Sequence, residues 1–119
     1  MDAFTGILKA SPDKRYRNFL STVADREAVW VLKNESGYVT YDNSGVSYLM
    51  LWPTQEFAKL FADGDMSDAI EVHDFCQRCK EAMAQAEIGF LVFYNGQDGC
   101  LVETAVLLAD LLEELDRIE

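Results

Sequence analysis

VSYLMLWPTQEFAKLFA, residues 46–62, is an apolar run that breaks at Trp52-Pro53 and restarts with a different hydrophobic period. Up to Trp52 nearly every side chain on both faces is apolar, which predicts a strand covered on both sides. Pro53 has no amide hydrogen for a neighbouring strand, so pairing should end there. Thr54 can then cap an amphipathic helix over residues 54–63. The stretch therefore predicts a buried strand that leads directly into a helix packed on the sheet.

The chain before this stretch is predicted to begin with an arm and a helix. Residues 1–10 lack a sustained hydrophobic period, so we expect a loosely packed N-terminal arm. Ser11-Pro12 is typical of a helix start, and the apolar residues that follow recur at helical spacing. We expect this helix to have a buried side with Tyr16, Phe19, Leu20 and Val23 and an exposed side with Lys14, Arg15, Arg17 and Asn18.

Three strands are predicted next, at residues 28–33, 38–41 and 46–52. The connections between them, NESG at residues 34–37 and DNSG at residues 42–45, are rich in residues that favour turns. Connections this short force antiparallel neighbours, so the sequence predicts a three-strand meander.

The rest of the chain alternates strands and helices. A short strand at residues 69–72 precedes a helix over residues 74–86, which Asp74 and Gln77 open as a capping box. Its expected core face is Phe75 or Cys76, then Cys79, Met83 and Ala86. Residues 88–94 read as a central strand that residues 95–99 turn back into residues 100–102. The last helix, residues 104–117, should bury one stripe made of Leu108, Leu111, Leu112, Leu115 and Ile118.

Together these elements predict one α+β domain over residues 1–119. We expect a mainly antiparallel sheet, meander plus hairpin, with about four helices packed on it. A chain of 119 residues is long enough to bury an ordinary hydrophobic core without disulfides. Its three cysteines are an odd number for a disulfide framework, so we expect reduced thiols.

Charge and hydropathy restrict the partners. The 21 acidic and 10 basic residues give a formal charge of −11, which repels phosphate backbones and anionic lipids. We therefore expect neither nucleic acid nor a membrane as a partner, and a basic protein is the partner that the charge would attract. The chain opens with no export signal or long apolar run, so we expect a cytoplasmic protein.

The sharpest chemical motif is Cys76-Gln77-Arg78-Cys79, a CxxC at the expected first turn of a helix. Backbone amides at a helix start lower a thiol pKa, which is how dithiol redox sites are built. Cysteines three apart also suit one buried helix face, where they act as small apolar side chains. A thiol oxidoreductase or redox sensor is therefore the enzymatic alternative.

Other catalytic and metal sites have weaker signals. His73, Cys76, Cys79 and Cys100 can be written as four zinc ligands, but ligands at steps of three turn around a helix instead of converging. His73 is the only histidine, and no serine sits in a nucleophile-elbow pattern. We predict no catalytic residue, no metal and no cofactor, and we do not expect an enzyme.

The aromatic residues near the strand-to-helix junction are the candidate binding residues. Trp30, Trp52, Pro53 and Glu56 can line a pocket or anchor a partner at the end of a strand. The alternative for the tryptophans is core packing with the indole N–H bonded to the backbone. The acidic last helix is a second candidate contact surface.

Four pieces of this sequence resemble the DUF2750 family of small uncharacterised bacterial proteins. They are the RYxxFL helix (Arg15, Tyr16, Phe19, Leu20), VWVL at residues 29–32, LWPTQEFAKL at residues 51–60, and the closing strand with its leucine-rich acidic helix. The similarity runs from about Lys14 to Glu114, and its most specific piece is Trp52, Pro53, Glu56, Phe57 and Ala58. The resemblance implies a small α+β bacterial protein with no established activity. We expect a non-enzymatic binding module, regulatory or immunity-like, and the sequence does not indicate an oligomeric state.

Overall fold

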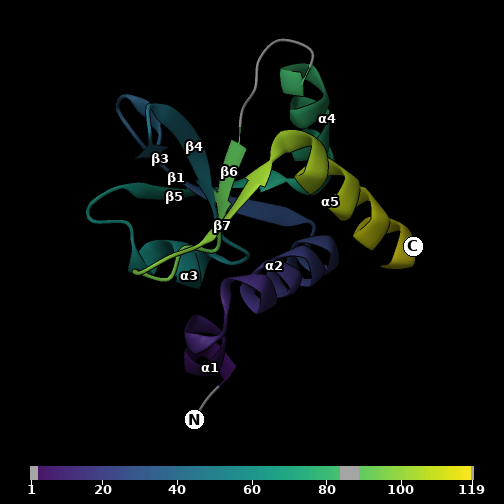
Figure 1. Ribbon diagram of the computed structural model, residues 1–119, viewed down its shortest axis with the longest axis horizontal. Helices are drawn as coiled ribbons and strands as arrows, with labels where there is room; N and C mark the ends of the chain where they lie inside the picture. The colour runs from purple at the N-terminus through teal and green to yellow at the C-terminus, as the bar shows by residue number, and fades with distance from the viewer. Residues whose placement is uncertain (1–2, 84–88, 119) are drawn as a thin grey trace.

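A computed structural model describes residues 3–83 and 89–118, and these residues form five helices and two β-sheets (Figure 1). The helices are α1 (Ala3–Lys9), α2 (Pro12–Arg26), α3 (Gln55–Leu60), α4 (Val72–Met83) and α5 (Thr104–Ile118). The strands are β1 (Ala28–Asn34), β2 (Gly37–Tyr38), β3 (Thr40–Asn43), β4 (Val46–Leu51), β5 (Met66–Glu71), β6 (Gly89–Val92) and β7 (Cys100–Glu103). The predicted α+β class is confirmed.

The strands divide between a first sheet in the order β2-β1-β5 and a second sheet in the order β3-β4-β6-β7. Every pairing is antiparallel except β4 with β6, which is parallel. The sheets meet where Trp30 and Trp52 exchange backbone hydrogen bonds of 3.0 and 2.9 Å. As predicted, β6 is a central strand, and it forms a hairpin with β7.

The predicted three-strand meander needs correction, because its middle strand is shared between the two sheets. Tyr38 in β2 pairs with Lys33 of the first sheet, whereas Tyr41 in β3 pairs with Tyr48 of the second. Between them the Val39 amide still donates to the Leu32 carbonyl over 2.8 Å. Neighbouring strands are twisted relative to one another. Because the middle segment is short, it separates from β1 where it begins to pair with β4.

The stretch that decides the fold forms the strand and helix expected of it. Strand β4 ends at Leu51, Pro53 follows, and the Thr54 hydroxyl accepts a 3.4 Å hydrogen bond from the Phe57 amide. The expectation that the strand is covered on both sides is wrong for its first half. Val46 is exposed and Leu51 is buried, because the β3–β4 hairpin extends beyond the helices (Figure 1).

One helix was not predicted from the sequence, and another begins earlier than predicted. Within the expected arm, residues 3–9 form α1, so the described part of the arm is helical. Helix α4 begins at Val72, and its cap is the Glu71 carboxylate, which accepts from the amides of His73 and Asp74. Asp74 is therefore not the cap, and Cys76 lies beyond the first turn. The predicted end of this helix, residues 84–86, lies outside the described residues.

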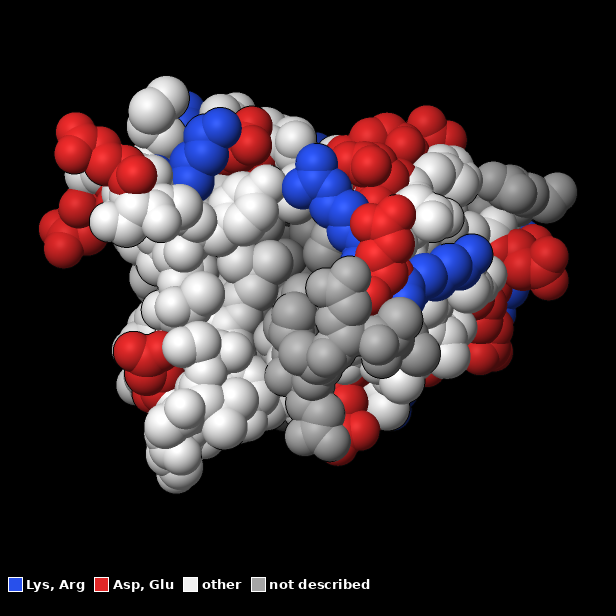
Figure 2. All heavy atoms as spheres, turned by 90° about the horizontal axis from the view of Figure 1, so that it is seen from above, with Lys and Arg blue, Asp and Glu red and all other residues white. Residues whose placement is uncertain are grey.

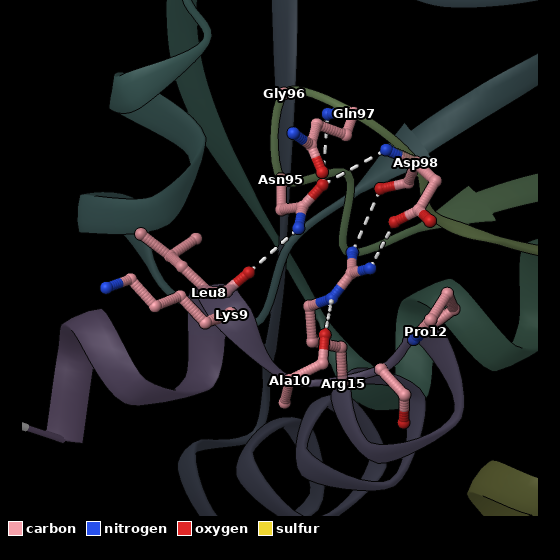
Figure 3. A pocket seen from close by; sticks show the side chains of 10 residues that line it. Leu8, Lys9, Ala10, Pro12, Arg15, Asn95, Gly96, Gln97 and Asp98 are labelled. Carbon is pink, nitrogen blue, oxygen red and sulfur yellow. Dashed lines mark hydrogen bonds and ion pairs between the residues drawn. The ribbon is translucent and has the colours of Figure 1, made fainter.

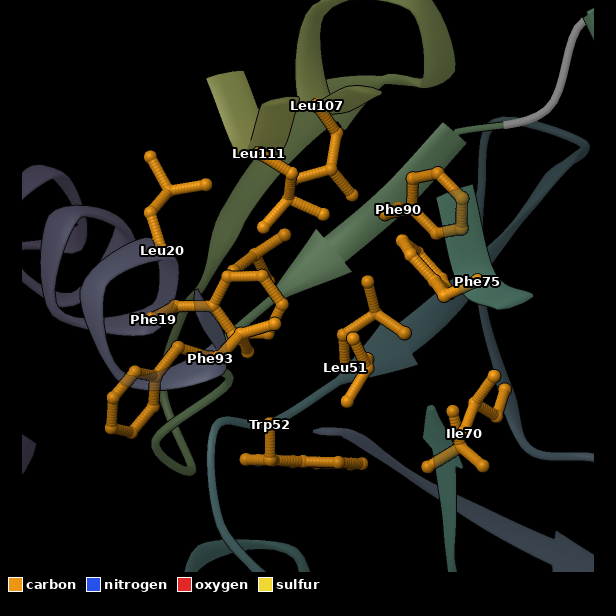
Figure 4. Close-up of a cluster of buried hydrophobic side chains, with 14 of the residues drawn as sticks. Phe19, Leu20, Leu51, Trp52, Ile70, Phe75, Phe90, Phe93, Leu107 and Leu111 are labelled. Atoms are coloured by element: carbon orange, nitrogen blue, oxygen red, sulfur yellow. The ribbon is translucent and has the colours of Figure 1, made fainter. Parts of the chain in front are cut away.

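The core joins the second sheet and helices α2, α4 and α5, and it includes Val29, Val31 and Leu32 of β1 and Ile70 of β5. Figure 4 shows Leu107 and Leu111 of α5 between Phe19 and Leu20 of α2 on one side and Phe75 and Phe90 on the other. The buried stripe of α5 is Leu107, Leu108, Leu111 and Leu115, whereas Leu112 is exposed, contrary to expectation. Since leucines occupy both candidate positions, the sequence pattern alone does not choose between Leu107 and Leu112. No helix in the described residues is long and apolar enough to cross a membrane.

Candidate functional site

The CxxC thiols lie in the core. Cys76 is 4% exposed and Cys79 3% exposed, and α4 places them on the same buried side as Phe75, whose ring packs 5.5 Å from that of Phe90. Burial raises the pKa of both thiols, that of Cys79 to about 12. A reactive dithiol needs access and a lowered pKa, and the structure gives these two thiols neither.

His73 lies apart from any converging set of ligands. Its Nδ1 lies 2.8 Å from the Glu71 carboxylate at the exposed start of α4. Among the residues that the structure describes, no three His, Cys, Asp or Glu side chains are arranged to hold a metal ion.

The junction residues are mostly inside the molecule. Trp52 is fully buried, its indole N–H donates to the Tyr94 carbonyl over 3.0 Å, and its ring stacks on Phe61. Pro53 is also buried and Trp30 is half-buried, which leaves Glu56 as the exposed member of the predicted set. The structure therefore does not present Trp52 and Pro53 to a partner, and the core-packing alternative describes the Trp52 indole.

One residue that the sequence predicted to face solvent is a centre of the structure. Arg15 is 1% exposed, and its guanidinium donates to the carbonyls of Ala10, Phe93 and Asp98 over 3.1, 2.6 and 2.9 Å. It also forms an ion pair with the Asp98 carboxylate (Figure 3). Arg15 thus attaches the β6–β7 loop to the first turn of α2.

Arg15 also fixes a strained backbone. Phe93 has a φ of 57°, which a bulky residue rarely adopts, and its carbonyl accepts the shortest of the carbonyl bonds from Arg15. Sequence reasoning missed this role because Arg15 lies among three polar neighbours at the solvent side of a helical pattern. The available signal was its spacing of four from Phe19, which puts both side chains on one face of the helix.

Arg15 and Asp98 help to line a cavity of about 570 Å³ between the end of α1, the start of α2 and the β6–β7 loop. Figure 3 shows Arg15, Asn95 and Asp98 turned toward one another across it. Asn95 donates to the Leu8 carbonyl over 2.8 Å and accepts from the amides of Gln97 and Asp98. The polar groups at the centre of the cavity are thus hydrogen-bonded to other groups of the chain, and we interpret the arrangement as a structural clamp.

The second sheet has a covered face and an opposite face that strand register defines. Helices α2 and α5 pack on the face that carries Phe90 and its partner Val102. On the opposite face Tyr41 pairs with Tyr48, and Leu101 pairs with Leu91. Val46 lies two residues from Tyr48 and so points the same way. Met50 and Leu91 on this face are buried, whereas the residues toward the hairpin tip and the β7 edge reach solvent to a greater extent. We call Tyr41, Val46, Tyr48 and Leu101 the uncovered face.

Three of these four side chains remain open to solvent in the described structure. Tyr41 is 40% exposed, Val46 44% and Leu101 46%, whereas Tyr48 is half-buried. Figure 2 looks down on the end of the molecule where the β3–β4 hairpin and α4 lie, and shows a wide area without charged side chains, with acidic and basic side chains at its margin. Exposed apolar side chains on one face of a sheet are typical of an interaction site.

Strands β3 and β4, which carry most of this face, contain an acidic side chain but no basic one. Between Lys33 and Lys59 the sequence contains acids, including Glu35 and Asp42, but no lysine or arginine. Glu103 on β7 is exposed and shares the uncovered side with Leu101, because both alternate with buried Val102. The sheet therefore has negative charge beside its exposed apolar side chains, from Glu103 on the same face and from Asp42 on the other side of β3, which is complementary to a basic surface.

Comparison with known proteins gives a family without a described activity. The family model described as protein of unknown function, DUF2750, matches residues 16–112, which is most of the chain and includes β3, β4 and β7. No curated protein matches.

Proposed function

Because the chain belongs to the DUF2750 family, described as proteins of unknown function, we propose its function from its own surface. The protein is a non-enzymatic interaction module that binds a basic protein partner on the uncovered face. Such a module acts by occupying a partner's surface, as regulatory and immunity-like proteins do. We place this activity in the cytoplasm.

The observation that carries the proposal is the exposure of Tyr41, Val46 and Leu101 on a single sheet face. Tyrosine beside aliphatic side chains supplies contact area at low entropic cost, which is why aromatic residues are enriched at interfaces. The formal charge of −11 adds long-range attraction for a basic partner and increases its association rate.

The thiol alternative has less support than the interaction module. Cys76 and Cys79 are buried with raised pKa values, so few thiolates would be available to attack a disulfide. If the alternative holds, native protein should show reversible Cys76–Cys79 oxidation and a thiol pKa near neutrality.

A pulldown with matched variants tests the proposal. The tagged chain is used as bait in cytosol of its own source, and we expect a stoichiometric partner of basic composition whose recovery falls as salt rises. Val46→Ser combined with Leu101→Ser removes apolar area from the uncovered face, so we expect recovery to fall at least about tenfold.

The control is Leu60→Ser combined with Met66→Ser, which removes exposed apolar side chains from α3 and β5. This variant should recover the partner as well as the wild type does. Equal recovery by the Val46/Leu101 variant, or the repeated absence of any stoichiometric partner, contradicts the proposal. Circular dichroism of each variant checks that the fold is retained.

A further inference from the structure

Strand β3 lies at the edge of the second sheet, with β4 as its neighbour. The β3–β4 hairpin turns through Ser44 and Gly45, which have φ of 52° and 83°, as a two-residue type I′ turn requires. In such a hairpin Asn43 and Tyr41 exchange backbone hydrogen bonds with Val46 and Tyr48. By the alternation of antiparallel strands, the backbone N–H and C=O groups of Thr40 and Asp42 point away from β4.

We propose that the partner binds by adding a strand to this edge. The occupant is an extended segment of a basic protein in which apolar side chains alternate with lysine or arginine. This inference rests on the proposed function and specifies how the partner sits. Main-chain hydrogen bonds to Thr40 and Asp42 supply affinity, and the two faces of the added strand supply specificity.

The two faces of β3 determine the alternating pattern. Tyr41 points to the uncovered face, so apolar residues of the added strand would lie beside it. Thr40 and Asp42 point to the other side, and the Asp42 carboxylate accepts a 2.7 Å hydrogen bond from the Ser47 hydroxyl. A lysine or arginine beside Asp42 forms a cross-strand ion pair, whereas an acidic residue there is repelled.

Charge favours a basic protein over a second copy of this chain. In an antiparallel pairing of two β3 edges, Asp42 of each copy approaches the other, and no lysine or arginine between residues 34 and 58 offsets the repulsion. A charged residue on a short edge strand is also how proteins prevent self-pairing. The same carboxylate attracts a basic strand, so the edge discriminates between the two occupants.

The test uses the full chain and a capped seven-residue peptide of alternating valine and lysine. Two further peptides carry backbone N-methyl groups on the lysines or on the last three valines. In an antiparallel addition the lysine amides face β3, because residues directly opposite each other share a face. We expect lysine methylation to weaken binding at least about tenfold and valine methylation to change it less than about threefold. A parallel addition reverses the two results.

Equal binding by the two methylated peptides means docking through side chains alone and overturns strand addition. Failure of the unmethylated peptide to bind overturns it as well. An alternating valine and glutamate peptide should not bind, and Asp42→Asn should weaken the lysine peptide by about threefold, whereas Asp63→Asn on another surface should not. A concentration-dependent dimer that Asp42→Asn strengthens would make a second copy the occupant.

These outcomes separate the inference from the proposed function. The Val46/Leu101 pulldown reports whether the uncovered face binds a partner at all. The methylated peptides report only whether a strand is added. If the pulldown succeeds and both methylated peptides bind equally, the interaction module stands and the strand addition fails.

Discussion

Arg15 is a cation in the core whose charge is offset by its neighbours. Three carbonyls and the Asp98 carboxylate accept from its guanidinium, and these acceptors come from two segments far apart in the sequence. Buried arginine is tolerated when its planar fork is matched in this way. The residue therefore attaches the β6–β7 loop to α2 instead of contributing to surface charge.

Replacing Arg15 with methionine tests this role. The substitution keeps apolar volume but leaves the Ala10, Phe93 and Asp98 carbonyls without their donor. We expect the free energy of unfolding to fall by about 3 kcal/mol, measured by urea denaturation. Arg15→Lys should recover only part of the loss, because an ammonium cannot reproduce the fork.

The matched control is Arg17→Met on the exposed side of the same helix. Arg17 pairs with Asp13 four residues away in full contact with solvent, so its loss should change stability by less than about 0.5 kcal/mol. Similar losses for the two substitutions would contradict the buried clamp.

The buried thiols predict a loss of stability at alkaline pH. An unfolded thiol has a pKa near 8.5, whereas burial raises the folded pKa of Cys79 to about 12. Between these values the unfolded state releases a proton that the folded state keeps. Stability is therefore fully present below pH 8.5 and falls as pH rises, by up to about 1.4 kcal/mol per pH unit for one such thiol.

Urea denaturation between pH 8 and pH 10 under reducing conditions measures this slope. Cys79→Ala should make the decrease smaller, since one of the buried thiols is gone. Burial and the hydrogen bond to Asp110 also raise the pKa of Tyr16, but its unfolded pKa is near 10, so it contributes at higher pH. An unchanged slope in Cys79→Ala would show that this thiol does not drive the decrease.

At the scale of elements, the junction between β4 and α3 depends on one hydroxyl. Thr54 is buried, and its oxygen caps α3 by accepting from the Phe57 amide. Thr54→Val keeps the shape and removes the oxygen, so we expect a loss of about 1 kcal/mol in thermal or urea unfolding. Thr54→Ser retains the cap and should be clearly more stable than Thr54→Val. If serine and valine cost the same, the cap does not stabilise the junction.

Local patterns predicted the elements that local chemistry determines. The break at Pro53, the cap at Thr54, the Ser11-Pro12 start and the β6–β7 hairpin all follow from residues adjacent in sequence. These features depend on backbone donors and turn conformations, which neighbouring residues control.

Features that depend on distant partners were not predicted. The sharing of the middle strand at Val39 arises because β3 follows β4 into another sheet, and the burial of Arg15 arises because a loop near residue 95 reaches α2. The candidate site shows the same limit. The sequence indicated Trp52 because it lies at the strand-to-helix junction. The uncovered face, in contrast, depends on which face of the second sheet the helices pack against.

At the scale of the whole molecule, the acidic surface acts on folding and on binding in opposite ways. With a formal charge of −11, like charges repel in the folded state, and salt screens them. We expect the melting temperature to rise between low salt and roughly 0.5 M NaCl, while recovery of a basic partner falls.

A charge-reduced variant checks the source of this effect. Glu35→Gln, Asp63→Asn and Glu81→Gln together remove three exposed negative charges. The combined variant should melt at a higher temperature at low salt and depend less on salt than the wild type. A salt dependence that is unchanged in this variant would place the repulsion elsewhere.

The most direct measurement is amide hydrogen exchange of the full chain, alone and with the partner that it retains. Binding on the uncovered face, with a strand added to β3, predicts slower exchange at residues 40–49 and 100–103 and little change at α5 or around Glu56. Slower exchange confined to α5, to the region around Glu56 or to the β6–β7 loop would contradict it.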